Sequence, residues 1–146
     1  MRIYVINGPN LNLLGIREVS IYGTKTYAQL LDFVHNVCVR ENMEVECFQS
    51  NHEGVLVDVI QSALGKADGI VINPAAFAHT SIAILDALKA VNMPAVEVHL
   101  SDIYQREVFR RVSYPAMACV AHYCGTGFAG YEKALLHVKR LVEMAR

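Results

Sequence analysis

The stretch Gly69-Ile-Val-Ile-Asn-Pro74 contains a short apolar run that stops abruptly at an asparagine and a proline. A nearly continuous apolar run bounded by turn residues is typical of a strand that is buried on both faces. Four further apolar runs predict strands elsewhere in the chain, at Ile3–Ile6, Met43–Phe48, Ala95–Val98 and Ala116–Ala121. We therefore expect five buried strands.

Segments of helical periodicity separate these runs. Apolar residues of Tyr27–Glu41 share one helical face, and Thr26 with Gln29 can form a capping box at its start. Three similar segments and one shorter, more polar candidate follow: Val55–Leu64, Ser81–Val91, Tyr131–Ala145 and Arg106–Arg111. Alternating strands and helices imply a parallel sheet covered on both faces. We predict an α/β, flavodoxin-like three-layer fold, with one domain over residues 1–146 and a five-stranded parallel sheet in the order 2-1-3-4-5.

Composition narrows the classes of function. Hydrophobic residues make up 53% of the 146 residues, and the mean hydropathy is +0.27, yet no apolar run approaches the roughly 18 residues of a membrane span. We attribute the apolar excess to buried strands and subunit interfaces. A net charge of −1 gives no reason to expect nucleic acid or a membrane surface as partner. The first residues do not show the basic segment followed by an apolar segment that is typical of a secretory signal, so we expect a cytoplasmic protein.

Two features that often mark metal or cofactor sites have simpler interpretations here. Four cysteines lack CxxC spacing and clustered histidines, so we expect free thiols and no metal: Cys38, Cys47, Cys119 and Cys124. Gly125-Thr-Gly-Phe-Ala-Gly130 matches GxGxxG, but a dinucleotide site also needs a later strand with an acidic residue. No such strand is predicted in the sixteen residues that follow. We interpret these glycines as a tight strand-to-helix turn and expect no cofactor.

Polar residues follow three of the predicted strands. Ligands of such sheets bind beyond the carboxyl ends of the strands, and the first, third and fourth strands are neighbours in the predicted order. A single histidine at such a place is more often structural, but the whole group favours one binding crevice. Its members are Asn10, Asn73, His79, Ser81, Asp86, His99, Ser101, Arg106 and Arg110. We expect His35, His52 and His137 to be structural or on the surface, and we assign no role to His122.

The connection Gly8–Gly23 is unusually long and shows neither helical caps nor strand alternation. Connections of this length are usually functional or disordered. This one carries Arg17 and Tyr22. A phenol, with an ordinary pKa of about 10, is a poor base at neutral pH, but a nearby guanidinium lowers the pKa of a phenol. Both interpretations remain open from the spacing of Arg17 and Tyr22 alone. It favours the alternative, in which the tyrosine ring packs against the protein and the arginine lies in solvent.

Taken together, these motifs resemble those of the type II 3-dehydroquinate dehydratases. The resemblance covers essentially the whole chain in order, and several of its motifs are long and unusual. The motifs are Ile6–Gly15, Arg17-Glu18 with Tyr22-Gly23, Gln49–Gly54, Asn73-Pro74 with His79–Ser81, Glu97–Ser101 and Phe109–Ser113. The resemblance implies the flavodoxin-like fold and the elimination of water from 3-dehydroquinate in the shikimate pathway, without metal or cofactor. It also implies a homododecamer, built as a tetramer of trimers.

Roles for individual residues come from the same resemblance. It implies that Tyr22 is the base, that Arg17 holds it as phenolate and that His99 is the acid that protonates the departing hydroxyl. It implies that Asn10 positions a water that stabilises the enolate. Substrate binding is implied for Asn73, His79, Asp86, Leu100, Ser101 and Arg110. No Schiff-base lysine is evident at a predicted strand end, which separates the chain from the imine-forming type I enzymes.

Three positions depart from the common pattern of the family. Val19 replaces a usual proline in the long connection, Phe77 replaces a tyrosine, and Leu85 replaces an arginine beside Asp86. We expect a less stiff lid from the first and altered subunit contacts near Asp86 from the last. The competing hypothesis from another class is a catalytically silent module that binds a small acid on the same fold.

Overall fold

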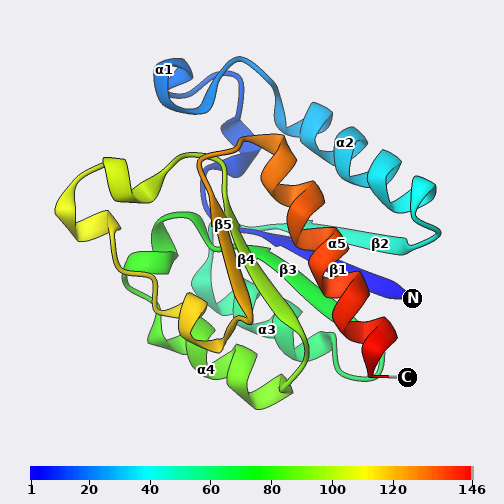
Figure 1. Ribbon diagram of the computed structural model, residues 1–146. Helices are drawn as coiled ribbons and strands as arrows, with labels where there is room; N and C mark the ends of the chain where they lie inside the picture. Colours follow the sequence, from blue (N-terminus) through cyan, green and yellow to red (C-terminus); the bar gives the residue numbers. More distant parts are fainter. Residues whose placement is uncertain (146) are drawn as a thin grey trace.

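Five parallel strands form the centre of the molecule in the computed structural model, which describes residues 1–145 (Figure 1). Their order is β2-β1-β3-β4-β5, as predicted. The strands are β1 (Arg2–Asn7), β2 (Glu44–Gln49), β3 (Gly69–Asn73), β4 (Ala95–His99) and β5 (Ala121–Cys124). Every residue of β3 and β4 is buried, as is typical of central strands in a parallel sheet with both faces covered.

Helices cover both faces of the sheet, so the predicted three-layer fold is confirmed (Figure 1). One face is packed by α2 (Tyr27–Arg40) and α5 (Phe128–Met144), and the other by α3 (Glu53–Ser62) and α4 (Ile82–Val91). Successive strand residues point to opposite faces, so neighbours along β1 and β3 belong to two separate cores. The predicted capping box forms at Thr26 and Gln29. Within residues 1–145, none of the helices has the length and apolar content that a membrane span requires.

The last predicted strand lies at the wrong residues. The sequence predicts a strand over Ala116–Ala121. In the structure, Pro115–Ala118 forms a 3₁₀ turn and β5 runs over Ala121–Cys124. Proline at the start of the turn favours helical geometry, because its ring fixes φ and it has no N–H to donate to a sheet. The true strand pairs only with β4 and is half-buried, so its sequence is too polar to stand out.

Two connections contain short helices that the sequence pattern does not predict correctly. The predicted helix Arg106–Arg111 is replaced by two 3₁₀ turns, Ile103–Gln105 and Val108–Arg110. The long connection after β1 contains a 3₁₀ turn, Leu11–Leu13, and the short helix α1 (Val19–Tyr22), where no helix was expected. Both sets of turns are too short for periodicity to reveal them.

The glycine motif between β5 and α5 is the tight turn that the sequence predicts. Gly125 and Gly127 adopt φ values of +80° and +56°, a region that side-chain-bearing residues rarely occupy. The helix then begins at Phe128, three residues before the predicted start at Tyr131. Tyr131 is completely buried on this helix, and its hydroxyl joins the carboxyl ends of β1 and β3.

The buried cysteine Cys38 makes the stability sensitive to alkaline pH. It is a free thiol that is only 1% exposed, and burial raises its pKa to about 11 from an ordinary 9.0. The unfolded thiol therefore ionises first as the pH rises, so stability present below about pH 9 is lost toward pH 11. We expect the free energy of unfolding in urea to fall by about 1–2 kcal/mol more in the wild type than in Cys38→Ala between pH 8 and 10.5. Equal losses in the two proteins would contradict this.

Candidate active site

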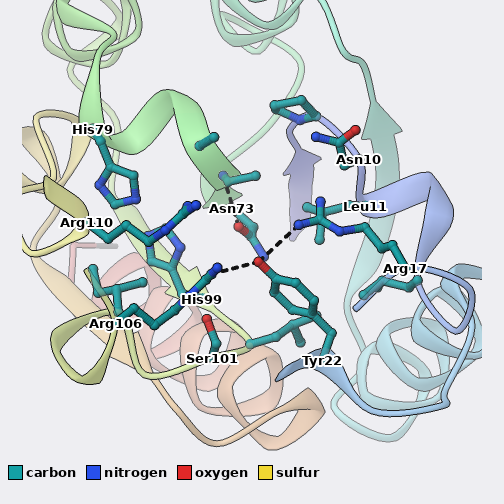
Figure 2. Close-up of a pocket in the computed structure, with 16 residues that line it drawn as sticks. Asn10, Leu11, Arg17, Tyr22, Asn73, His79, His99, Ser101, Arg106 and Arg110 are labelled. Atoms are coloured by element: carbon teal, nitrogen blue, oxygen red, sulfur yellow. Dashed lines mark hydrogen bonds between the residues drawn. The ribbon is translucent and has the colours of Figure 1, made fainter. Parts of the chain in front are cut away.

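A cavity of about 160 Å³ lies beyond the carboxyl ends of β1, β3 and β4 (Figure 2). It includes nine of the ten residues predicted for the site and omits Asp86. The sixteen residues that line it are Pro9, Asn10, Leu11, Leu14, Arg17, Tyr22, Asn73, Ala75, Ala76, His79, His99, Leu100, Ser101, Ile103, Arg106 and Arg110. Among them there are three arginines but no aspartate, glutamate or lysine. Such a lining favours a small anionic ligand.

The first wall of the cavity is held by close backbone packing. Gly8 donates its N–H to the Asn73 carbonyl at 2.7 Å, and a Cβ at Gly8 would lie 2.5 Å from the Pro74 carbonyl oxygen. Only glycine permits this approach between the connections after β1 and β3. Asn10 follows in the left-handed region, and its N–H donates to the Asn51 side chain at 2.9 Å. Leu11 and Leu14 are buried and tie this part of the connection to the core.

Tyr131 of α5 joins the ends of β1 and β3 beneath the cavity. Its hydroxyl donates to Asn7 Oδ1 at 2.7 Å and accepts from Asn73 Nδ2 at 2.9 Å. Asn73 Oδ1 in turn accepts the N–H of Ala75 at 3.1 Å. All three side chains are buried, so each hydrogen bond replaces one that water would otherwise make. Burial also raises the pKa of Tyr131, which keeps the hydroxyl protonated.

Removal of this hydroxyl is expected to destabilise the protein. Tyr131→Phe removes the hydroxyl partner of two buried amide atoms, Asn7 Oδ1 and Asn73 Nδ2, which costs on the order of 2–3 kcal/mol in the free energy of unfolding. Tyr123→Phe is the matched control, because Tyr123 is half-buried and its hydroxyl bonds to a single side chain within residues 1–145, that of His137 at 3.0 Å. Urea denaturation of both variants gives the comparison. Similar small losses would show that the buried network does not hold the strand ends.

Tyr22 lies at the end of α1, between two arginines that reach it from different parts of the chain (Figure 2). Arg17 Nη2 donates to the Tyr22 hydroxyl oxygen at 3.1 Å, and Arg106 Nη1 donates to the same oxygen at 2.8 Å. The Arg17 guanidinium also lies 4.6 Å from the ring centroid. Two cationic donors on one oxygen stabilise negative charge there. The structure thus brings Arg17 and Tyr22 together, against the preference from spacing alone.

Arg106 is the residue of this constellation that the sequence analysis left without a role. It follows β4 by several residues and comes from a segment of 3₁₀ turns. The sequence shows that Arg106 lies near Arg110, after the end of a predicted strand. Because 84 residues separate it from Tyr22, the sequence does not show that the two side chains meet. Only the folded chain shows which of the two arginines faces the phenol.

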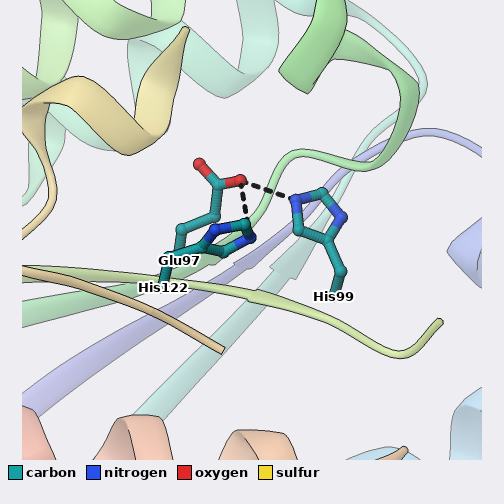
Figure 3. Close-up of side chains that lie close together, drawn as sticks. All are labelled: Glu97, His99 and His122. Atoms are coloured by element: carbon teal, nitrogen blue, oxygen red, sulfur yellow. Dashed lines mark hydrogen bonds and ion pairs between the residues drawn. The ribbon is translucent and has the colours of Figure 1, made fainter. Parts of the chain in front are cut away.

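His99 is held from behind by a buried carboxylate. Its Nε2 lies 2.6 Å from Glu97 Oε1, and both side chains are almost fully buried. Ser113 donates to Glu97 from the other side, at 2.7 and 2.9 Å to the two oxygens. The Nδ1 atom of His99 lies on the side of the ring away from Glu97 (Figure 3). Glu97 was part of a sequence motif but had no predicted role.

His122 lies next to this pair, within β5 rather than after it. Its Nε2 is 3.7 Å from Glu97 Oε1, and its ring meets the His99 ring edge-on at 5.4 Å between centroids (Figure 3). Burial lowers its pKa, although the Glu97 carboxylate opposes this effect. At neutral pH the ring is therefore mainly uncharged.

The remaining predicted residues occupy the rim and floor of the cavity. His79 Nδ1 contacts the Val112 carbonyl oxygen at 2.7 Å, and the His79 ring stacks near that of His99. Arg110 donates to Glu107 at 2.7 Å. The pKa of Glu107 is lowered, first by a hydrogen bond from its own backbone N–H and then by the Arg110 guanidinium. Leu100 and Ser101 follow β4 directly and line the cavity.

Asp86 is the one predicted site residue that the fold does not bring to this cavity. It lies on the exposed side of α4, which packs against the opposite face of the sheet from α2 and α5. The helical periodicity of the sequence does not show which pocket the Asp86 side chain faces. Ser81, also noted at a strand end, caps α4 by accepting the N–H of Ile84 at 2.9 Å and is structural.

Comparisons with known proteins agree with this fold. The model of the family "Dehydroquinase class II" matches residues 1–139. A 3-dehydroquinate dehydratase of Clostridium acetobutylicum is 50% identical over 97% of this chain and 99% of its own length. The crystal structure of a type II dehydroquinase from Butyrivibrio crossotus has 48% identity and a TM-score of 0.94, over 95% of this chain and 97% of that one. One from Propionibacterium acnes has 38% identity and a TM-score of 0.89, over 97% and 96%. The resemblance in the motifs is confirmed: the chain belongs to the class II dehydroquinase family.

Proposed function

We propose that the enzyme eliminates water from 3-dehydroquinate through an enolate, with Tyr22 as the base and His99 as the acid. Membership of the class II dehydroquinase family makes it a hydro-lyase, a 3-dehydroquinate dehydratase. The observation that carries the proposed mechanism is the Tyr22 oxygen, which accepts hydrogen bonds from Arg17 and Arg106 in the same cavity as His99.

The first step needs a base beside the carbon next to the ketone. Arg17 and Arg106 stabilise the phenolate of Tyr22, which takes the proton from that carbon and leaves an enolate. The developing negative charge needs hydrogen-bond donors at the former ketone oxygen. Asn10, on the wall opposite α1, is proposed to hold a water there, which matches its fixed backbone at the edge of the cavity.

The second step needs an acid, because hydroxide is a poor leaving group. His99 gives a proton to the departing hydroxyl, which leaves as water as the enolate electrons form the carbon–carbon double bond. Glu97 favours this role, because its buried carboxylate binds His99 Nε2 at 2.6 Å and holds the ring with Nδ1 on the opposite side. Return of one proton from Tyr22 to solvent, and of one from solvent to His99, restores the starting state.

The substrate carboxylate and hydroxyls have suitable partners around these two groups. We propose that the turn at Leu100 and Ser101 binds the carboxylate with its N–H and hydroxyl donors. Asn73, His79 and Arg110 then bind the ring hydroxyls. The absence of acidic side chains from the described lining supports an anionic substrate.

The ultraviolet absorbance of the product tests this function, because 3-dehydroshikimate is a conjugated enone and the substrate is not. We expect purified protein with 3-dehydroquinate to give a steady increase in absorbance. The competing hypothesis of a silent acid-binding module predicts binding without this increase. No signal at micromolar enzyme would overturn the proposed activity.

Asp86 and the exposed apolar residues support the proposed homododecamer. Asp86 does not line the cavity of its own chain, so the contact with substrate that the family resemblance implies would be made in the cavity of another subunit. Ile82, on the same helix, is 56% exposed, and Val108 and Phe109 near the cavity are 73% and 65% exposed. Apolar side chains this exposed are typical of surfaces that another copy covers.

The assembly gives a direct prediction for the mass in solution. Twelve chains of 16.2 kDa each correspond to about 194 kDa. We expect light scattering of the native protein to give this mass, and the mass of a single chain would contradict the proposal. Phe109→Asp places a charge on the exposed apolar surface and is expected to shift the mass downward.

A further inference from the structure

We propose that Glu97, His99 and His122 form a binding site for a divalent transition-metal cation such as Zn²⁺, and that its occupancy inhibits the enzyme. One ligand atom from each residue lies within 4.8 Å of the other two (Figure 3). The two strands β4 and β5 supply all three side chains, with Glu97 paired to His122 in the sheet register. Rigid neighbouring strands hold these atoms in place better than a loop would.

The donor set fits the cation. Two imidazole nitrogens and one carboxylate oxygen are common ligands of zinc, and three protein ligands leave a fourth position for water. Ligand atoms of a tetrahedral zinc lie about 3.3 Å apart. The observed separations, 2.6 Å from Glu97 to His99 and 3.7 Å from Glu97 to His122, lie on either side of this value. The third separation, between the nitrogens of His99 and His122, is at most 4.8 Å, so the two rings have to rotate toward the ion to bind it.

The unpartnered nitrogen of His122 is the second observation that indicates a ligand. His122 Nε2 is buried and has no hydrogen-bond partner within the described residues, and it points at the Glu97 carboxylate. Buried polar atoms without partners are rare in folded proteins. Its other nitrogen, Nδ1, lies 3.3 Å from the Tyr104 hydroxyl. When Nδ1 carries the proton, this hydroxyl can accept the hydrogen bond from it. That tautomer leaves a lone pair on Nε2, which is the form that binds metal.

Inhibition follows from the position of His99, and this part rests on the proposed role of His99 as the acid. The cation replaces the proton on His99 Nε2, which is released to solvent. It also takes the Glu97 carboxylate as a ligand, so Glu97 no longer makes its hydrogen bond with His99 Nε2. A metal-bound imidazole is a much weaker proton donor, and the departing hydroxyl is then not protonated.

Zinc titration of the whole enzyme, first freed of metal with a chelator, tests the binding site without turnover. We expect isothermal titration calorimetry to give one Zn²⁺ per chain, and Co²⁺ to give the visible absorption of a tetrahedral site. His122→Asn is expected to weaken Zn²⁺ binding at least tenfold, on the order seen when a metal site loses a supporting group. His35→Asn, which changes an exposed histidine of α2, is the matched control and should bind as the wild type does.

The enone assay supplies the second readout. We expect stoichiometric Zn²⁺ to abolish turnover in the wild type and in His35→Asn, and the chelator to restore it. His122→Asn should turn over substrate and resist the same Zn²⁺ concentration. Absence of a single tight site, equal binding by His122→Asn, or binding without inhibition would overturn the proposal. Because the metal-free enzyme is assayed first, failure of the proposed activity would be seen separately.

Discussion

Tyr22→Phe is expected to lower kcat by about 10²–10⁴-fold, the range that a positioned general base contributes. The variant keeps the aromatic ring but removes the oxygen on which Arg17 and Arg106 converge. Because that oxygen is proposed to act on the reacting carbon, substrate binding should change little. The enone assay measures kcat, and calorimetry with an unreactive substrate analogue measures affinity.

Tyr123→Phe serves as the control for Tyr22→Phe, since its hydroxyl contacts His137 and lies outside the cavity. We expect its kcat to match that of the wild type. Turnover retained by Tyr22→Phe would remove Tyr22 as the base. A loss of analogue affinity as large as the loss of kcat would instead assign Tyr22 to substrate binding.

Arg106→Gln has the second-largest expected effect, a fall in kcat of about 10²–10³-fold at neutral pH, as for the loss of one donor to a catalytic oxyanion. Arg106 makes the shorter of the two hydrogen bonds to the Tyr22 oxygen, 2.8 Å against 3.1 Å. Arg17 also pairs with Glu18 at 2.7 Å, which neutralises part of its charge. Glutamine can donate a hydrogen bond but carries no charge, so the variant isolates the electrostatic part of the interaction.

A split between kcat and KM separates this role from simple substrate binding. If Arg106 assists the Tyr22 oxygen in the proton abstraction, Arg106→Gln should lower kcat and leave KM nearly unchanged. Arg111→Gln, at an exposed position close by, is the matched control and should leave both constants unchanged. A defect in Arg106→Gln that appears only in KM would refute the role.

The family motifs identified most of the cavity, because they are contiguous in the sequence and each follows a strand of the sheet. Asn73 and His99 are the last residues of β3 and β4, so the strand pattern alone was enough to place them together. Glu97, Ser113 and Arg106 have roles that depend on side-chain direction. Glu97 points behind His99, and no sequence pattern shows which oxygen or nitrogen it meets.

The alternation of buried strands and amphipathic helices could be predicted from the chain alone, because both leave a periodic signal. The order of the sheet followed from the flavodoxin-like fold, of which such an alternation is typical. Motifs such as Ile6–Gly15 identified the family. Three features can be seen only in the folded protein: β5 lies at Ala121–Cys124, Arg106 joins Arg17 on Tyr22, and His122 meets Glu97 and His99. They depend on contacts with a distant strand or loop, and local periodicity contains no information about such long-range contacts.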